Sequence, residues 1–238
     1  MRMRFKPYAR PELLACDFHV HEPLSMQGKW NQSYARPEQP LYLELGCGKG
    51  VSTCQMALED PAHNYLAVDL ITSVLGVARR NAEEAYRGVR DVDNLILTNF
   101  HIEYIYKYLS EQDRVERIYI SFCNPWDKRP KQAKHRLTHP RQLRQYRAFL
   151  EDGGEIWFKT DDDRLFEDSV EYFKNTGFEI TCLTRDLHAS GFTPNYESEH
   201  EKMFDAQGVP IKFLIAVKQH LDGEVFREYR PGEDPPYI

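Results

Sequence analysis

Three glycines at alternate positions in the stretch "LELGCGKG" have the spacing that most directly suggests chemistry. They are Gly46, Gly48 and Gly50, and Glu44 lies two residues before the first of them. Glycine lets a backbone turn sharply and lets a ligand approach where a Cβ would block it. The stretch is neither the P-loop G-x-x-x-x-G-K-S/T nor the dinucleotide pattern G-x-G-x-x-G, because its third glycine comes one residue early. It predicts a ligand-binding loop of another kind, with a structural tight turn as the alternative.

Polar residues end the next two apolar segments of the chain. Asp69 follows "LAV" and Asn99 follows "LILT". A carboxylate at the end of a second strand suits a ribose, because one carboxylate can accept from both hydroxyl donors. Asn99 would be within reach of an adenine, although an ordinary turn asparagine explains it equally well. Together with Glu44 and the glycines, Asp69 resembles the S-adenosylmethionine site of Rossmann-like methyltransferases.

A dense basic segment follows an Asn-Pro-Trp turn. From Lys128 to Arg147 the chain has eight Lys or Arg and no Asp or Glu, although its formal net charge is -6. Residues 1–10 add four more basic side chains without an acid, so the remainder of the chain is strongly acidic. Such a run predicts a surface that binds the phosphates of a polyanion, and the alternative is the solvated face of a helix.

These residues must be positioned by elements that alternate along the chain. Apolar segments typical of strands cover 41–46, 64–70, 93–100, 117–122, 155–161, 178–184 and 211–219. Segments typical of helices cover 51–60, 72–89, 142–154 and 163–177. This alternation predicts an α/β fold with a mostly parallel sheet and helices on both faces. In such a sheet ligands bind at the carboxyl ends of the strands.

Length and composition favour one domain with appendages. We expect a basic N-terminal arm at 1–34, a core domain at 35–218 and a polar tail at 219–238. No apolar run is long enough for a membrane helix and no signal region follows the N-terminus, so a cytoplasmic protein without a membrane partner is expected. The five scattered cysteines form no C-x-x-C pair, and His19 and His21 lack a third ligand, so we expect no metal.

The chain resembles the bacterial tRNA (guanine-N7-)-methyltransferase family over nearly its whole length. The resemblance is carried by "MRMRFKPYA", "GKWN", "ELGCGKG", "NPWDK", "KHRLT", "GGEIWFKTD", "RDLH" and "SEHEKMFDAQGVPI". It implies a Rossmann-like class I methyltransferase fold, S-adenosylmethionine as cofactor and tRNA as partner. It also implies that the product is 7-methylguanosine in the tRNA variable loop. A monomer or a homodimer is expected.

The same resemblance implies roles for individual residues. The cofactor-binding positions are Glu44, Gly46, Gly48, Asp69, Asn99 and Asn124. The substrate-binding positions are Lys128, Asp161, Ser198, Glu199, His200 and Glu201. Asn124 and Lys128 are expected to flank the reacting guanine, which makes Asn124 the catalytic candidate.

Three segments depart from the family pattern. The family usually has Asp-Pro-Trp-Pro-Lys where this chain has Asn124 to Lys128, an Asp at position 99, and Thr-x-Tyr-Glu at 198–201. Guanine N7 carries no proton, so methyl transfer to it needs alignment and desolvation rather than a general base. Asn124 keeps one acceptor for the base but loses the charge, which predicts a slower reaction. The alternative is a tRNA-binding paralogue with weak or lost activity.

Overall fold

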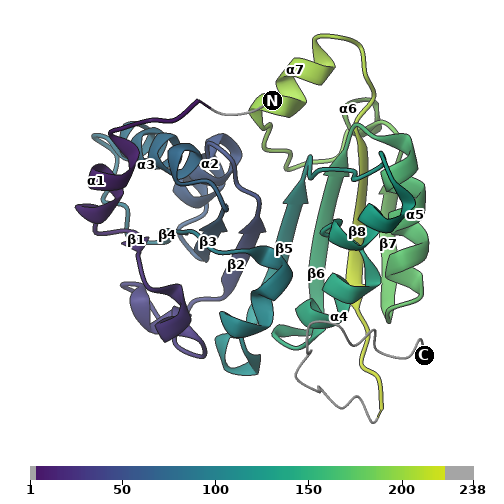
Figure 1. Cartoon of the computed structure of the whole chain (residues 1–238), viewed down its shortest axis with the longest axis horizontal. Helices are drawn as coiled ribbons and strands as arrows, with labels where there is room; N and C mark the ends of the chain where they lie inside the picture. Colours follow the sequence, from purple (N-terminus) through teal and green to yellow (C-terminus); the bar gives the residue numbers. More distant parts are fainter. Residues whose placement is uncertain (1–3, 223–238) are drawn as a thin grey trace.

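A single sheet runs through the computed structural model, which describes residues 4–222 (Figure 1). Its strands are β1 His19–Val20, β2 Leu41–Leu45, β3 Asn64–Val68, β4 Leu95–Thr98, β5 Val115–Ser121, β6 Leu150–Thr160, β7 Phe178–Thr184 and β8 Lys212–Lys218. They lie in the order β1-β4-β3-β2-β5-β6-β8-β7. β8 is antiparallel to both of its neighbours, and the other neighbouring strands pair in parallel. The predicted mostly parallel α/β sheet is confirmed.

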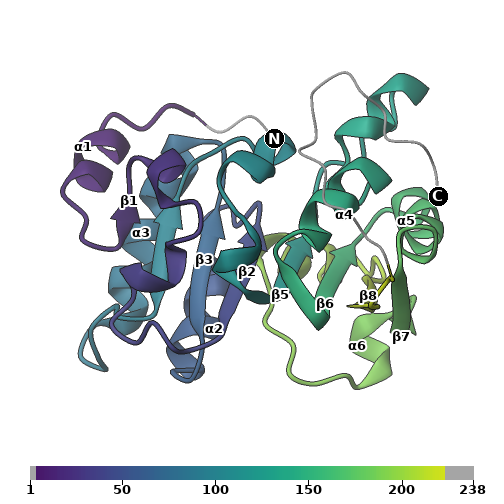
Figure 2. The ribbon, with the colours of Figure 1, turned by 90° about the horizontal axis from the view of Figure 1, so that it is seen from below.

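Helices cover the two faces of this sheet. They are α1 Ala9–Leu14, α2 Val51–Glu59, α3 Thr72–Tyr86, α4 Pro140–Arg147, α5 Asp163–Lys174, α6 Leu187–Ser190 and α7 Glu199–Asp205. Short 3-10 helices occupy Pro23–Met26, Trp30–Ser33, Ile102–Lys107, Glu111–Asp113 and Pro130–His135. α4 and α5 lie on one side of the sheet, and α2 and α6 lie on the other (Figure 2). No helix within residues 4–222 has the length and apolar character needed to cross a membrane.

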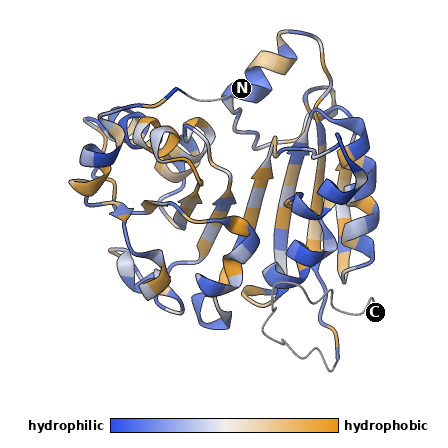
Figure 3. Ribbon diagram, viewed as in Figure 1, coloured by the Kyte–Doolittle hydropathy of each residue, from blue (hydrophilic) through white to orange (hydrophobic). Residues whose placement is uncertain are grey.

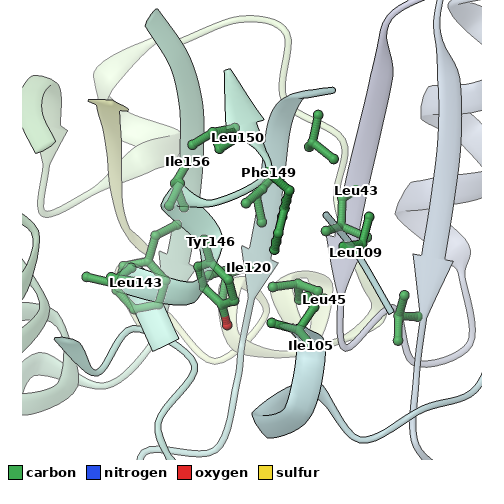
Figure 4. Packing of buried hydrophobic residues seen from close by; sticks show 14 of the residues in the cluster. Leu43, Leu45, Ile105, Leu109, Ile120, Leu143, Tyr146, Phe149, Leu150 and Ile156 are labelled. Atoms are coloured by element: carbon green, nitrogen blue, oxygen red, sulfur yellow. The ribbon is translucent and has the colours of Figure 1, made fainter. Parts of the chain in front are cut away.

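Strands β2, β3 and β4 are buried on both faces and are mostly apolar. Strand β5 instead alternates buried and half-buried residues, and its hydropathy alternates along the strand (Figure 3). Successive side chains of a strand point to opposite faces. Leu43 and Leu45 of β2 join the core beneath α4 and α5, while Tyr42 joins the core beneath α2 and α3. Figure 4 shows the first of these cores, where Leu143 and Tyr146 of α4 pack beside the sheet. The same alternation places Glu44 on the α2 face.

The N-terminal residues take part in this fold. α1 packs against α3 because Gly76 leaves room for Ala9, and a Cβ at Gly76 would lie 2.4 Å from the Ala9 Cβ. β1 pairs with β4 at the edge of the sheet, with His19 opposite Leu97. Residues 9–20 of the predicted arm are therefore continuous with the core. The predicted tail falls mostly outside the described residues, because they end at 222.

The predicted helix over 142–154 is wrong in its second half. α4 ends at Arg147, and β6 begins at Leu150. Val115 pairs with Leu150 and Arg117 pairs with Glu155, so residues 151–154 form a bulge opposite one residue of β5. Gly153, with φ +80°, turns the chain inside this bulge. The glycine pair that resembles a helix stop in the sequence therefore serves a strand.

Candidate functional site

The predicted cofactor residues follow four adjacent strands at one edge of the sheet. Leu45 of β2 pairs with Val68 of β3 and with Ile120 of β5, and Val68 pairs with Thr98 of β4. The chain leaves each of these strands into a loop that carries a predicted site residue. The sheet thus brings Gly46, Asp69, Asn99 and Asn124 to its carboxyl edge, the edge near α7 in Figure 1.

The glycine loop between β2 and α2 is open on its outer side. Gly46 has φ +82° and Gly48 has φ +57°, and a Cβ built on either glycine meets nothing within 4 Å. The loop is nevertheless fixed, because the backbone N–H groups of Gly46 and Cys47 donate to the Val68 oxygen at 2.9 and 3.0 Å. The backbone is thus fixed, and the space on its outer side stays open because glycine has no side chain to fill it. Such a loop fits a bound cofactor.

Asp69 links this loop to the end of β3. Its Oδ2 accepts from the Gly48 N–H at 3.0 Å and its Oδ1 accepts from the Ile71 N–H at 2.9 Å. Burial raises the pKa of Asp69, and these backbone hydrogen bonds oppose that rise. Since each carboxylate oxygen has a second lone pair, the group can still accept from ribose hydroxyls.

Glu44 lies beneath the loop, with 4% of its surface exposed. Thr53 of α2 donates its hydroxyl hydrogen to Glu44 Oε2. Burial raises the pKa of Glu44 to about 7, and the positive charge of Lys159 opposes this rise. This hydrogen bond ties the end of β2 to α2, the two elements that flank the loop, and the predicted contact of Glu44 with a cofactor stays a prediction.

Asn124 sits in a turn with two unusual backbone conformations. Phe122 has φ +52° and Trp126 has φ +48°, a region that bulky residues rarely adopt outside constrained sites. The exposed Asn124 accepts from the Trp126 N–H through Oδ1 at 3.0 Å. One lone pair of the oxygen that the sequence assigned to the substrate base is therefore already used by the turn.

The basic segment is less uniform than predicted. Arg136 is buried, and it donates to the Pro125 oxygen at 2.6 Å and to Asp168 Oδ2 at 2.5 Å. Arg147 is also buried, and it donates to the backbone oxygens of Gly177 and Gln219. The exposed cations are Lys128, Arg129, Lys131 and Lys134, with Arg141 and Arg144 half-buried. Two of the eight cations therefore hold the fold together, and the other six remain candidates for the predicted phosphate-binding surface.

Asp161 follows β6 at the same edge of the sheet and is half-buried. Its backbone oxygen accepts from Lys212 Nζ at 3.0 Å, which fixes the turn between β6 and α5. The neighbouring Asp162 caps α5, because its Oδ1 accepts from the Leu165 N–H at 2.6 Å. Asp162 is therefore the helix cap, and Asp161 is the residue with the predicted substrate contact.

The four predicted substrate residues at 198–201 open α7, and they differ in exposure. Ser198 caps the helix by accepting from the Glu201 N–H at 3.1 Å, and Glu199 pairs with Lys49 of the glycine loop at 2.7 Å. His200 is exposed, with its ring centroid 6.2 Å from that of Phe122. Glu201 has no exposed surface, so in this structure it does not face a substrate.

Two lysines of the site were missed in the sequence. Lys49 joins the glycine loop to α7, and Lys159, at the end of β6, is buried against Glu201. A lysine inside the apolar strand "EIWFKT" was the available signal, because lysine is seldom buried without a partner. Among residues 4–222 no three His, Cys, Asp or Glu side chains gather closely enough to hold a metal ion.

Comparison with known proteins agrees with this geometry. A family model described as "Putative methyltransferase" matches residues 38–214. A tRNA (guanine-N(7)-)-methyltransferase of Clostridium perfringens (strain SM101) is 54% identical over 219 residues, which are 92% of this chain and all of that protein. One of Clostridium botulinum (strain Eklund 17B) is 53% identical with the same coverage, and one of Ruminiclostridium cellulolyticum is 51% identical over 91% of this chain and 92% of that protein.

Solved structures share the fold at low sequence identity. An antibiotic-related methyltransferase has a TM-score of 0.54 at 14% identity, covering 84% of this chain and 92% of that one. The 16S rRNA methyltransferase KamB has a TM-score of 0.54 at 12% identity, covering 92% and 96%. These likenesses identify the fold as the predicted Rossmann-like class I methyltransferase fold.

Proposed function

The chain belongs to the family of tRNA (guanine-N(7)-)-methyltransferases, and from this premise we propose how its residues serve the reaction. It is an enzyme that methylates guanine N7 in tRNA with S-adenosylmethionine as the methyl donor. We place the target guanosine in the variable loop and the enzyme in the cytoplasm, where its substrate is. No comparison favours the alternative of a binding paralogue without activity.

The glycine loop and Asp69 would hold the cofactor. S-adenosylmethionine supplies an electrophilic methyl group on a sulfonium. Gly46 and Gly48 leave the space that the cofactor needs, and the second lone pairs of Asp69 suit its ribose hydroxyls. Asn99, half-buried at the end of β4, lies at the adjacent position for the adenine. Glu44, bonded to Thr53, would hold together the strand and the helix that flank the loop.

The reaction requires little of the protein beyond alignment. Guanine N7 has an exposed lone pair and no proton, so the chain needs to orient the base in line with the methyl group and exclude water. Asn124, at the end of β5 next to the glycine loop, is placed to orient the base. The exposed Lys128, on the same segment as Asn124, and the exposed His200, whose ring centroid lies 6.2 Å from that of Phe122, would bind the RNA. Asp161 would complete the pocket at the end of β6.

A product analysis tests this function. Purified protein is incubated with methyl-labelled S-adenosylmethionine and bulk tRNA, the RNA is digested, and the labelled nucleoside is identified. We expect 7-methylguanosine. Label in another nucleoside would contradict the assigned target, and tight tRNA binding without label would support the binding paralogue. Sedimentation of the same sample measures whether the enzyme is the expected monomer or homodimer.

The conclusion rests chiefly on one observation. An open glycine loop, fixed by Asp69, occurs in a chain that covers the C. perfringens and C. botulinum relatives over their full length.

A further inference from the structure

Lys159 is an enclosed ammonium group at the carboxyl end of β6. Its side chain is 11% exposed, and Nζ donates to Glu201 Oε2 at 3.1 Å, to the Tyr196 backbone oxygen at 3.2 Å and to Asn195 Oδ1. A lysine ammonium has three hydrogens to donate, and these three acceptors satisfy them all. All three acceptors belong to the segment 195–201, which leads into α7.

Glu201 is equally well fixed at the other end of this ion pair. Its Oε1 accepts from Asn195 Nδ2 at 2.7 Å and lies 3.2 Å from His188 Nε2 of α6. Its side chain has no exposed surface. A buried carboxylate in such a place depends on its cation, because removing one partner of a buried pair leaves an uncompensated charge.

The charge of Lys159 also acts on a second buried carboxylate, that of Glu44. Ile156 and Phe158 of β6 belong to the core beneath α4 and α5, so Lys159 points to the opposite face, the face that carries Glu44. The charge of Lys159 acts on Glu44, which lies below the glycine loop. The charge of one cation therefore acts on two buried carboxylates, Glu44 at the end of β2 and Glu201 inside α7.

We propose that Lys159 is a positioning residue for methyl transfer. Its ammonium group holds residues 195–201 at the carboxyl edge of the sheet, so that α7 faces the glycine loop in the alignment that transfer requires. The proposal rests on the proposed function, because it concerns the tRNA-dependent step. Lys159 contacts neither the methyl group nor the base in this scheme. It acts through Glu201 and Asn195. The more exposed ion pair of Lys49 with Glu199 joins the glycine loop to α7 directly.

The test measures single-turnover methylation with saturating tRNA, expressed per cofactor-binding site, for the wild type and for Lys159→Met. We expect the variant to be slower by about 10-fold or more, while its affinity for S-adenosylmethionine changes by less than about 3-fold, because the loss falls on alignment in the transition state. A merely structural role would lower the number of competent sites and leave the rate per site unchanged. A wild type that does not methylate tRNA would refute the proposed function instead.

Two further variants separate positioning from folding. Glu201→Gln keeps the shape of the side chain and removes its charge, so it tests the same ion pair if Lys159→Met does not fold. The double variant should be no slower than the slower single variant, because both changes break one contact. Independent effects that multiply would overturn the proposal, as would a Lys159→Met rate equal to the wild type.

Lys218→Met is the matched control. Lys218 is also a buried lysine, and it donates to the backbone oxygens of Arg147 and Leu150. It is the last residue of β8, whereas Lys159 of β6 pairs with Phe213 near the first residue of that strand. We expect its rate per site to equal the wild type even if its stability falls. A rate lowered as much as by Lys159→Met would show that any buried lysine has this effect, and the assignment to Lys159 would be wrong.

Discussion

Asn124 is held by its own turn before any substrate arrives. Its Oδ1 accepts a hydrogen bond from the Trp126 N–H, and Phe122 and Trp126 have left-handed backbone conformations. Together these features fix the direction of the Asn124 amide. Pro125, inside the turn, is held in addition by Arg136. A side chain fixed in this way loses little freedom when it orients a base, which is what an alignment-driven reaction requires.

Substitutions at position 124 test this role. Asn124→Asp retains an acceptor for Trp126 and adds a charged oxygen that can accept from the base, so we expect faster single-turnover methylation. Asn124→Ala removes the partner of the Trp126 N–H and should slow the reaction. Each change should be about 1 to 3 kcal/mol in the barrier, the size of one positioned hydrogen bond. Three equal rates, measured with saturating tRNA, would exclude a role for this side chain.

Gly48 provides a second test at the level of one residue. Gly48→Val places a branched side chain in the open space of the loop and strains a backbone at φ +57°. We expect titration calorimetry to detect no binding of S-adenosylmethionine. Gly153→Val is the control, because Gly153 has φ +80°, also meets nothing within 4 Å and lies in the bulge of β6. Equal affinity of the Gly48 variant and the wild type would refute the assigned site.

At the level of elements, the 3-10 helix Pro130–His135 connects the Asn124 turn to α4. Arg136 follows this helix and holds the connection against the rest of the fold. The guanidinium joins Pro125 in the turn to Asp168 on α5. The sequence alone suggests one more phosphate-binding cation at this position, but in the structure Arg136 positions the turn that carries Asn124. The exposed cations before it are held at a fixed place relative to the site.

Arg136→Met should therefore destabilise the fold. We expect the free energy of unfolding in a denaturant titration to fall by about 2 to 3 kcal/mol, less than for a fully buried pair because Asp168 is 38% exposed. Arg164→Met is the control, since Arg164 is 70% exposed and 4.0 Å from the same carboxylate. Its effect should stay below about 0.5 kcal/mol. Similar losses in both variants would contradict an anchoring role for Arg136.

The elements also show what the sequence could predict. Period and glycine placement located β2, α2, β3, α3, β4 and α5, because each is a local pattern followed by a local stop. The bulge at 151–154 was missed because it exists only through pairing with β5. The burial of Arg136, Arg147 and Glu201 likewise depends on partners 32, 30 and 42 residues away. Charge patterns alone do not distinguish a paired cation from a free one.

At the scale of the whole molecule, an acidic chain presents positive charge beside one edge of its sheet. The net charge is -6, yet Lys128, Arg129, Lys131 and Lys134 lie exposed on the segment that leaves the Asn124 turn. The acidity of most of the remaining chain, outside the basic residues 1–10, disfavours RNA there, so the uneven charge should orient an approaching tRNA toward the carboxyl edge. In the proposed scheme, recognition would depend on long-range charge, and catalysis would depend on the loops at the same edge.

The salt dependence of tRNA binding measures how many of these cations meet phosphates. If the four exposed residues each displace a counterion, log affinity should fall with log salt at a slope of about -3 to -4. Lys131→Gln with Lys134→Gln should make the slope shallower by about 1.5 to 2, since each lost phosphate contact removes nearly one unit. Arg114→Gln with Lys174→Gln is the control, because these side chains are 72% and 55% exposed and lie where β5 begins and α5 ends, away from the site. An unchanged slope in the first pair, or an equal change in the control pair, would show that tRNA does not bind along this segment.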